Sequence, residues 1–122
     1  MKNQYKHIIT FVWSSDIEKS LRFYTDILGF QQGFTKENWI ELSVPGLHTV
    51  YFALNKWTRS ETVPANNFIT LGVENLAEFR KKLVSENINL KGESEFYEEG
   101  IKLLKFADPD GNIITAAEVA KS

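Results

Sequence analysis

The sequence predicts an α+β fold built from two tandem βαβββ modules. Two polar cap residues, Asp16 and Asn75, each follow a short run rich in β-branched and aromatic residues and precede an apolar stripe of helical period. Three strand-like runs follow each stripe, separated by turn residues. The repeated order indicates a duplicated module and not a solenoid, which needs at least three repeats.

The first module is predicted over residues 5–55 and begins with a strand at His7–Trp13. Ser15 and Glu18 have the spacing of a capping box, so a helix is expected to follow and to end at Gly29. Its apolar stripe comprises Ile17, Leu21, Tyr24 and Leu28. The three later strands are expected at Phe30–Thr35, Asn38–Val44 and Thr49–Leu54.

The second module is predicted over residues 67–120, after a polar connector at 56–66 that contains Pro64. A strand at Asn67–Val73 precedes a second capping-box spacing between Asn75 and Glu78. The helix stripe there is Leu76, Phe79 and Leu83, and later strands are expected near Leu90–Ser94, Ile101–Phe106 and Asn112–Val119. The 122 residues fit a single domain, 1–122.

Two such modules are expected to join into one curved mixed sheet with the helices on its convex side. The concave side then forms a crevice suited to a small molecule.

The composition excludes several classes of function. A net charge of −2 with both signs scattered along the chain gives no basic stripe for nucleic acid. No apolar run approaches the ~20 residues of a membrane span, so we expect a cytoplasmic protein with no membrane partner. The absence of cysteine removes disulfides and thiolate sites, and His7 and His48 are the only possible nitrogen ligands for a metal.

Three segments, 15–24, 27–30 and 106–112, resemble the vicinal oxygen chelate superfamily. This superfamily includes glyoxalase I, fosfomycin-modifying enzymes, extradiol dioxygenases and bleomycin-binding resistance proteins. The resemblance spans nearly the whole chain and implies the same paired-module fold. The matching segments form a cap, a helix face, a helix stop and a turn, so they do not by themselves identify a function.

The resemblance also implies where a metal would be held, because metalloenzymes of this superfamily place ligands on the first, fourth, fifth and eighth strands. The corresponding positions here are Ile9, Phe52, Phe68 and Thr115. Three of them have no donor atom, and threonine is a poor neutral ligand. His7 could replace Ile9 by a two-residue slip, whereas Glu118, three residues after Thr115, would lie on the opposite face. We therefore expect no metal and no cofactor.

The same four positions mark the expected ligand-facing side of the strands, and strand alternation adds their companions. The residues predicted to contact a ligand are Trp13, Trp39, Glu41, Phe52, Phe68, Lys105 and Thr115. Core packing is the competing interpretation for each aromatic residue. Glu41 and Lys105 either orient a polar ligand, exchange protons with it, or stay solvated at the rim. The acidic residues Glu93, Glu95, Glu98 and Glu99 either form a solvated loop or attract a cationic ligand.

Three functional hypotheses follow. The first is a metal-independent homodimeric protein, similar to bleomycin-type antibiotic resistance proteins, which binds an aromatic or amphipathic small molecule in the crevice. The second is an enzyme, which would be either a glyoxalase-like lyase or isomerase using Glu41, Lys105 or His7, or a dioxygenase-type metalloenzyme with an atypical metal site. The third is a non-catalytic protein-interaction module.

Overall fold

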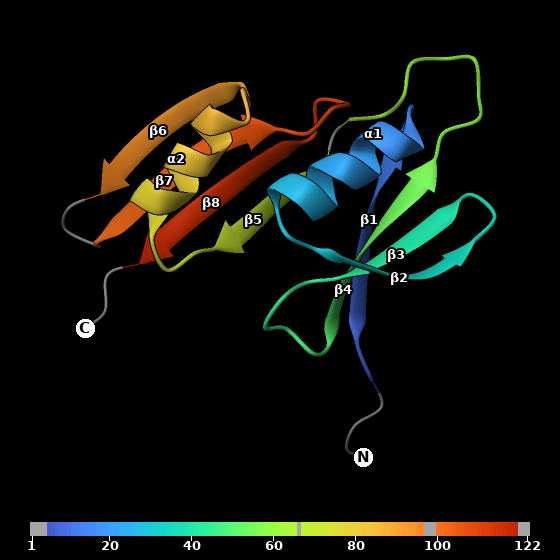
Figure 1. Ribbon diagram of the computed structural model, residues 1–122, viewed down its shortest axis with the longest axis horizontal. Helices are drawn as coiled ribbons and strands as arrows, with labels where there is room; N and C mark the ends of the chain where they lie inside the picture. The colour runs from blue at the N-terminus through green and yellow to red at the C-terminus, as the bar shows by residue number, and fades with distance from the viewer. Residues whose placement is uncertain (1–4, 66, 97–99, 120–122) are drawn as a thin grey trace. The chain divides into compact units, whose positions relative to one another are not determined.

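The computed structural model describes residues 5–65, 67–96 and 100–119 (Figure 1). The chain divides into two compact units, residues 1–64 and 65–122. Each unit contains one βαβββ module with its own four-stranded mixed sheet. The predicted α+β class and the duplicated module are therefore confirmed.

In the first unit, the sheet has the strand order β1-β4-β3-β2. β1 pairs with β4 in parallel, and the other neighbours are antiparallel. A π-helical turn, η1, extends the helix α1. The elements are β1 (Ile8–Ser14), α1 (Ile17–Arg22), η1 (Phe23–Ile27), β2 (Gln31–Lys36), β3 (Trp39–Ser43) and β4 (Val50–Lys56).

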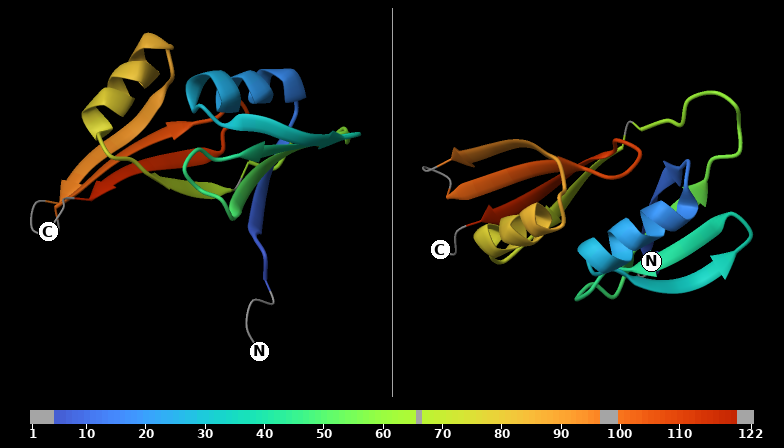
Figure 2. Two further views of the ribbon diagram at one scale, coloured as in Figure 1. Left: turned by 60° about the horizontal axis from the view of Figure 1, so that its bottom comes forward. Right: turned by 45° about the horizontal axis from the view of Figure 1, so that its top comes forward.

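The second unit repeats this topology with the order β5-β8-β7-β6. β5 pairs with β8 in parallel, and β8, β7 and β6 are antiparallel neighbours. In both units the helix lies over one face of its own sheet (Figure 2). The elements are β5 (Phe68–Gly72), α2 (Leu76–Ser85), β6 (Leu90–Phe96), β7 (Ile101–Ala107) and β8 (Ile113–Val119).

The first helix starts one residue later than the Ser15–Glu18 spacing indicates. Asp16 has an extended backbone and is the N-cap, because its Oδ1 accepts the backbone N–H of Lys19 at 3.2 Å. Gly29 follows the helical segment with a φ of +79°, as the predicted helix stop requires.

The core of the first unit lies between the helical segment and one face of the sheet. The Tyr24 ring packs on Phe52 at a centroid distance of 4.6 Å and on Phe30 at 5.9 Å. Ser14 on β1 and Ser20 on α1 share a buried hydrogen bond of 2.6 Å between their hydroxyl groups. This bond satisfies both polar groups and fixes the helix against the strand.

The core of the second unit is built in the same way. Phe79 on α2 packs on Phe106 of β7 at 5.8 Å, and Leu83 and Leu104 are each 1% exposed. The Glu118 carboxylate at the end of β8 accepts the backbone N–H of Leu76 at 2.7 Å. A carboxylate at this position satisfies an otherwise unpaired N–H at the helix N-terminus and interacts favourably with the helix dipole.

Within the described residues, no helix has the length and apolar character needed to cross a membrane.

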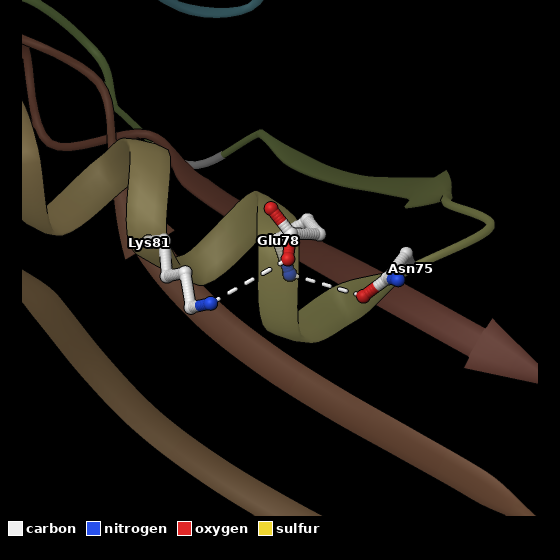
Figure 3. A network of polar contacts seen from close by, with 3 residues as sticks. All are labelled: Asn75, Glu78 and Lys81. Carbon is white, nitrogen blue, oxygen red and sulfur yellow. Dashed lines mark hydrogen bonds and ion pairs between the residues drawn. The ribbon is translucent and has the colours of Figure 1, made fainter.

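The cap of α2 gives a test of this local structure. Asn75 Oδ1 accepts the N–H of Glu78 at 3.0 Å, and Lys81 forms an exposed 3.5 Å ion pair with Glu78 (Figure 3). Asn75→Ala should lower the free energy of unfolding by about 1 kcal/mol, because one helix N–H loses its partner. Lys81→Gln should change it by less than about 0.5 kcal/mol, because exposed ion pairs contribute little. Urea unfolding measures both values, and equal losses would contradict the assignment of Asn75 as the cap.

Candidate functional site

The candidate site lies on the open face of the first sheet, which is the face opposite α1 and η1. The strand register arranges its side chains in three rows across β1, β4 and β3. The rows are Ile9–Tyr51–Ser43, Phe11–Ala53–Glu41 and Trp13–Asn55–Trp39.

An aromatic cluster covers one end of this open face. It consists of Phe11, Trp13, Trp39 and Trp57. Phe11 contacts Trp13 edge-on at a centroid distance of 5.5 Å and Trp39 at 5.8 Å, and Trp13 contacts Trp57 at 5.2 Å. These separations are typical of favourable aromatic pairs.

The cluster combines buried packing with partial access to solvent. Ala53 on β4 lies in the row between Phe11 and Glu41 and is fully buried, although it is on the open face. Phe11 remains 37% exposed, and the three tryptophans are half-buried. The cluster therefore shields the sheet and still presents aromatic surface.

Polar groups border the cluster. Trp39 Nε1 donates a hydrogen bond to Glu41 Oε2 at 3.4 Å, and Trp57 Nε1 donates to the backbone oxygen of Glu61 at 2.9 Å. The Arg59 guanidinium lies 5.7 Å from the centre of a Trp57 ring. This distance is within the range of a cation–π contact.

Phe52 is not on the open face, so its predicted place on the ligand-facing side is wrong by one residue. Its ring packs on Tyr24 and Phe30, and the residue is only 2% exposed. In the register, Tyr51 is the β4 residue beside Ile9 on the open face. The Tyr51 and His7 rings form a T-shaped pair with a centroid distance of 5.3 Å.

In the second unit, the open face opposite α2 carries the three residues predicted to contact a ligand, Phe68, Lys105 and Thr115. Thr115 on β8 pairs with Thr70 on one side and Lys105 on the other. Phe68 on β5 is 82% exposed, which is unusual for so large an apolar side chain. Lys105 is exposed and Thr115 is half-buried.

The residues at the implied metal positions do not fit a metal centre. With the β4 register corrected, they are Ile9, Tyr51, Phe68 and Thr115, which offer only two neutral hydroxyl groups. In the parts of the chain that the structure describes, no three His, Cys, Asp or Glu side chains gather as ligands. Glu118 lies on the opposite face from Thr115, as the alternation predicts. There its carboxylate accepts the N–H of Leu76 at the N-terminus of α2.

The first unit thus brings Trp13, Trp39 and Glu41 together and adds three residues absent from the predicted contact set. Strand alternation places Phe11 on the same face as Trp13, two residues further along, and the register confirms that placement. Tyr51 requires the corrected register. Trp57 follows the last strand, and no local pattern indicates its contact with Trp13. Glu98 and Glu99 of the acidic segment lie outside the described residues.

Residues 4–115 match the family model of the Glyoxalase/Bleomycin resistance protein/Dioxygenase superfamily. The chain belongs to this superfamily. The resemblance predicted from the three short segments is therefore confirmed. A comparison with curated proteins gives no match.

Solved structures of this superfamily's fold match nearly the whole chain. An integron cassette protein from the mobile metagenome of the Halifax Harbour sewage outfall is 25% identical, with a TM-score of 0.78 over 93% of this chain and 97% of that chain. An antibiotic-binding protein from a Streptomyces species is 20% identical, with a TM-score of 0.81 over 96% and 98%. A lactoylglutathione lyase from Agrobacterium tumefaciens is 13% identical, with a TM-score of 0.73 over 91% of both chains. At 20% and 13% identity, the last two likenesses show the fold alone.

The corrected register predicts opposite roles for two adjacent residues. Phe52→Ala should lower the free energy of unfolding by about 3 kcal/mol or more, because it leaves a cavity beside Tyr24. Tyr51→Ala should cost only about 1 kcal/mol, because its half-buried ring lies on the open face. Urea unfolding of the two variants compares them directly. A larger loss for Tyr51→Ala would show that the register is reversed.

Proposed function

We propose that this member of the superfamily is a small-molecule-binding protein that holds an aromatic or amphipathic ligand on the open face of its first sheet without a metal ion. The observation that carries the proposal is the aromatic cluster of Phe11, Trp13, Trp39 and Trp57 beside Glu41. This cluster lies on the sheet face opposite the helix and is partly open to solvent.

The chemistry of the cluster favours a ligand with a flat apolar part. Indole and phenyl rings provide large rigid surfaces, and stacking on them contributes about 0.5–1.5 kcal/mol per pair beyond area burial. Glu41 can accept a hydrogen bond from an amine or hydroxyl group of the ligand, because one carboxylate still has several lone pairs after the contact with Trp39. Sparse polar groups of this kind orient a ligand that apolar contacts hold.

Phe68, Lys105 and Thr115 remain proposed ligand contacts on the second unit. An exposed phenylalanine ring gains from being covered by an apolar ligand surface. Lys105 can pair with an acidic group, and the Thr115 hydroxyl can donate or accept a hydrogen bond. Phe52 is dropped from the proposed set because its ring is in the core.

The relatives are consistent with this proposal. One solved structure of the same fold is an antibiotic-binding protein. A lactoylglutathione lyase also has this fold. The residues at the implied metal positions argue against metal-dependent lyase chemistry, because isoleucine and phenylalanine cannot ligate a metal.

Tryptophan fluorescence tests the binding proposal directly. Titration with a panel of planar antibiotics and aromatic metabolites should change the emission with at least one compound. Trp39→Leu should weaken that binding about tenfold, because a stacking surface and the contact that holds Glu41 are both lost. Phe34→Leu is the matched control, because it removes an exposed ring of the same unit that lies outside the cluster.

The urea midpoint of Trp39→Leu shows whether this variant still folds. Glu41→Gln gives a second measurement of ligand binding with a substitution that keeps the size of the side chain. Absence of binding to every compound would contradict the proposal. So would turnover of the glutathione hemithioacetal that requires added Zn²⁺ or Ni²⁺.

We also propose that the protein forms a homodimer in the cytoplasm. Analytical ultracentrifugation of the purified chain should give twice the mass of one chain at micromolar concentration. A species of single-chain mass across the whole concentration range would contradict the dimer and would leave the ligand-binding proposal unaffected.

A further inference from the structure

A second candidate site lies in the second unit, on the sheet face that α2 covers. A cavity of about 190 Å³ opens between the first turns of α2 and the strands β6 and β7. The register places Glu93, Lys102 and Leu104 on this face and Lys105 and Thr115 on the other. The cavity is therefore separated by the sheet from the proposed ligand contacts of this unit.

The floor and walls of the cavity are apolar. Leu76 on α2 is 9% exposed, Leu104 on β7 is 1% exposed, and Ala77 adds a methyl group. Pockets for drug-sized ligands usually measure about 300–1,000 Å³. A cavity of this smaller size suits one aromatic ring or a short aliphatic chain.

The rim of the cavity is charged: of the described side chains that line it, Arg80 and Lys102 are positive and Glu93 is negative. Arg80 on α2 donates from Nε to Glu93 Oε1 at 2.7 Å, while its side chain is still 49% exposed. Lys102 on β7 is exposed and forms no ion pair with any side chain that the structure describes. The register pairs Lys102 with Glu95 on β6 and with Glu118 on β8. Glu118 directs its Oε1 to the N–H of Leu76.

The contact with Glu93 leaves the chemically useful part of Arg80 available. It occupies Nε, so the two terminal nitrogens of the guanidinium keep their N–H groups. Two parallel N–H groups match the two oxygens of a carboxylate, and such paired contacts are stronger than contacts between neutral groups. Lys102 supplies a second positive charge at the same rim.

We infer that this cavity binds a small organic monocarboxylate, with the carboxylate on Arg80 and Lys102 and the apolar body against Leu76 and Leu104. This site does not depend on the proposed function, because it lies on the opposite face of a sheet in the second unit.

Phenylacetate is a suitable probe, and phenylacetamide is its neutral counterpart of similar shape. Titration of the ¹⁵N-labelled 122-residue chain with phenylacetate should shift the amide resonances of Ala77, Arg80 and Leu104. A dissociation constant on the order of 1 mM is expected for so small a ligand. Phenylacetamide should bind about tenfold more weakly, because it cannot form the charge-assisted pair.

Arginine variants test the role of the guanidinium. Arg80→Gln should weaken phenylacetate binding about tenfold, and Arg80→Lys should give an intermediate loss, because it keeps the charge but not the paired N–H groups. Lys81→Gln is the matched control, because it removes one positive charge from the next position of the same helix, where Lys81 pairs with Glu78 outside the cavity. It should leave the affinity unchanged.

Three results would overturn the inference: no shifts at the cavity residues, equal affinity for phenylacetate and phenylacetamide, or equal losses for Arg80→Gln and Lys81→Gln. The first would remove the site altogether. The second would indicate an apolar cavity without carboxylate recognition, and the third a general effect of net charge. The urea midpoint of Arg80→Gln checks its fold, and Arg80→Lys keeps the test informative if that midpoint falls.

Discussion

In each unit the helix packs against one face of a four-stranded sheet, and the alternation of side chains along the strands therefore decides which residues form the core. The contact of Tyr24 with Phe52 in the first unit and that of Phe79 with Phe106 in the second establish which face is internal. Every residue one position away along the same strand points to the other face. The candidate site is a consequence of this constraint, because the open face is composed of the residues that the core does not use.

β4 shows how strongly the site depends on which face of the strand each residue occupies. It pairs with β1 on one side and β3 on the other, and Phe52, Ala53 and Leu54 are all buried. Phe52 and Leu54 are covered from the helix side, where Phe52 meets Tyr24. Ala53 lies on the other face, in the same row as Phe11 and Glu41. A strand buried on both faces loses the alternation of polar and apolar residues.

The missing alternation on β4 explains which parts of the site could be predicted from the sequence. Trp39 and Glu41 alternate with Ile40 and Leu42 on β3, so their common face could be predicted correctly. On β4 the only polar side-chain group from Val50 to Leu54 is the tyrosine hydroxyl. No local pattern therefore indicates whether Tyr51 or Phe52 faces the core. The error of one residue arose there and moved a core residue into the predicted contact set.

The fold itself was largely predictable, because its signals are local. The second helix begins at the predicted cap, Asn75, and most strand ends differ from prediction by one or two residues. Features formed by distant residues were not predictable. The backbone N–H of Trp57 bonds to the carbonyl of Ser14, which brings Trp57 next to Trp13. Arg80 of α2 and Glu93 of β6, which line the cavity under α2, likewise meet across two elements.

The scaffold of the aromatic cluster bears on how tightly it can bind a ligand. Phe11, Trp13 and Trp39 project from strands whose opposite face is core, and Phe11 contacts Trp13 at 5.5 Å and Trp39 at 5.8 Å. Side chains already packed in this way lose little rotamer freedom on binding, which lowers the entropic cost. Catalysis by a metal would require a different donor set on these strands, whereas binding of an apolar surface requires only that the rings stay rigid and partly exposed. The arrangement of this face therefore supports the proposed recognition of an apolar ligand surface.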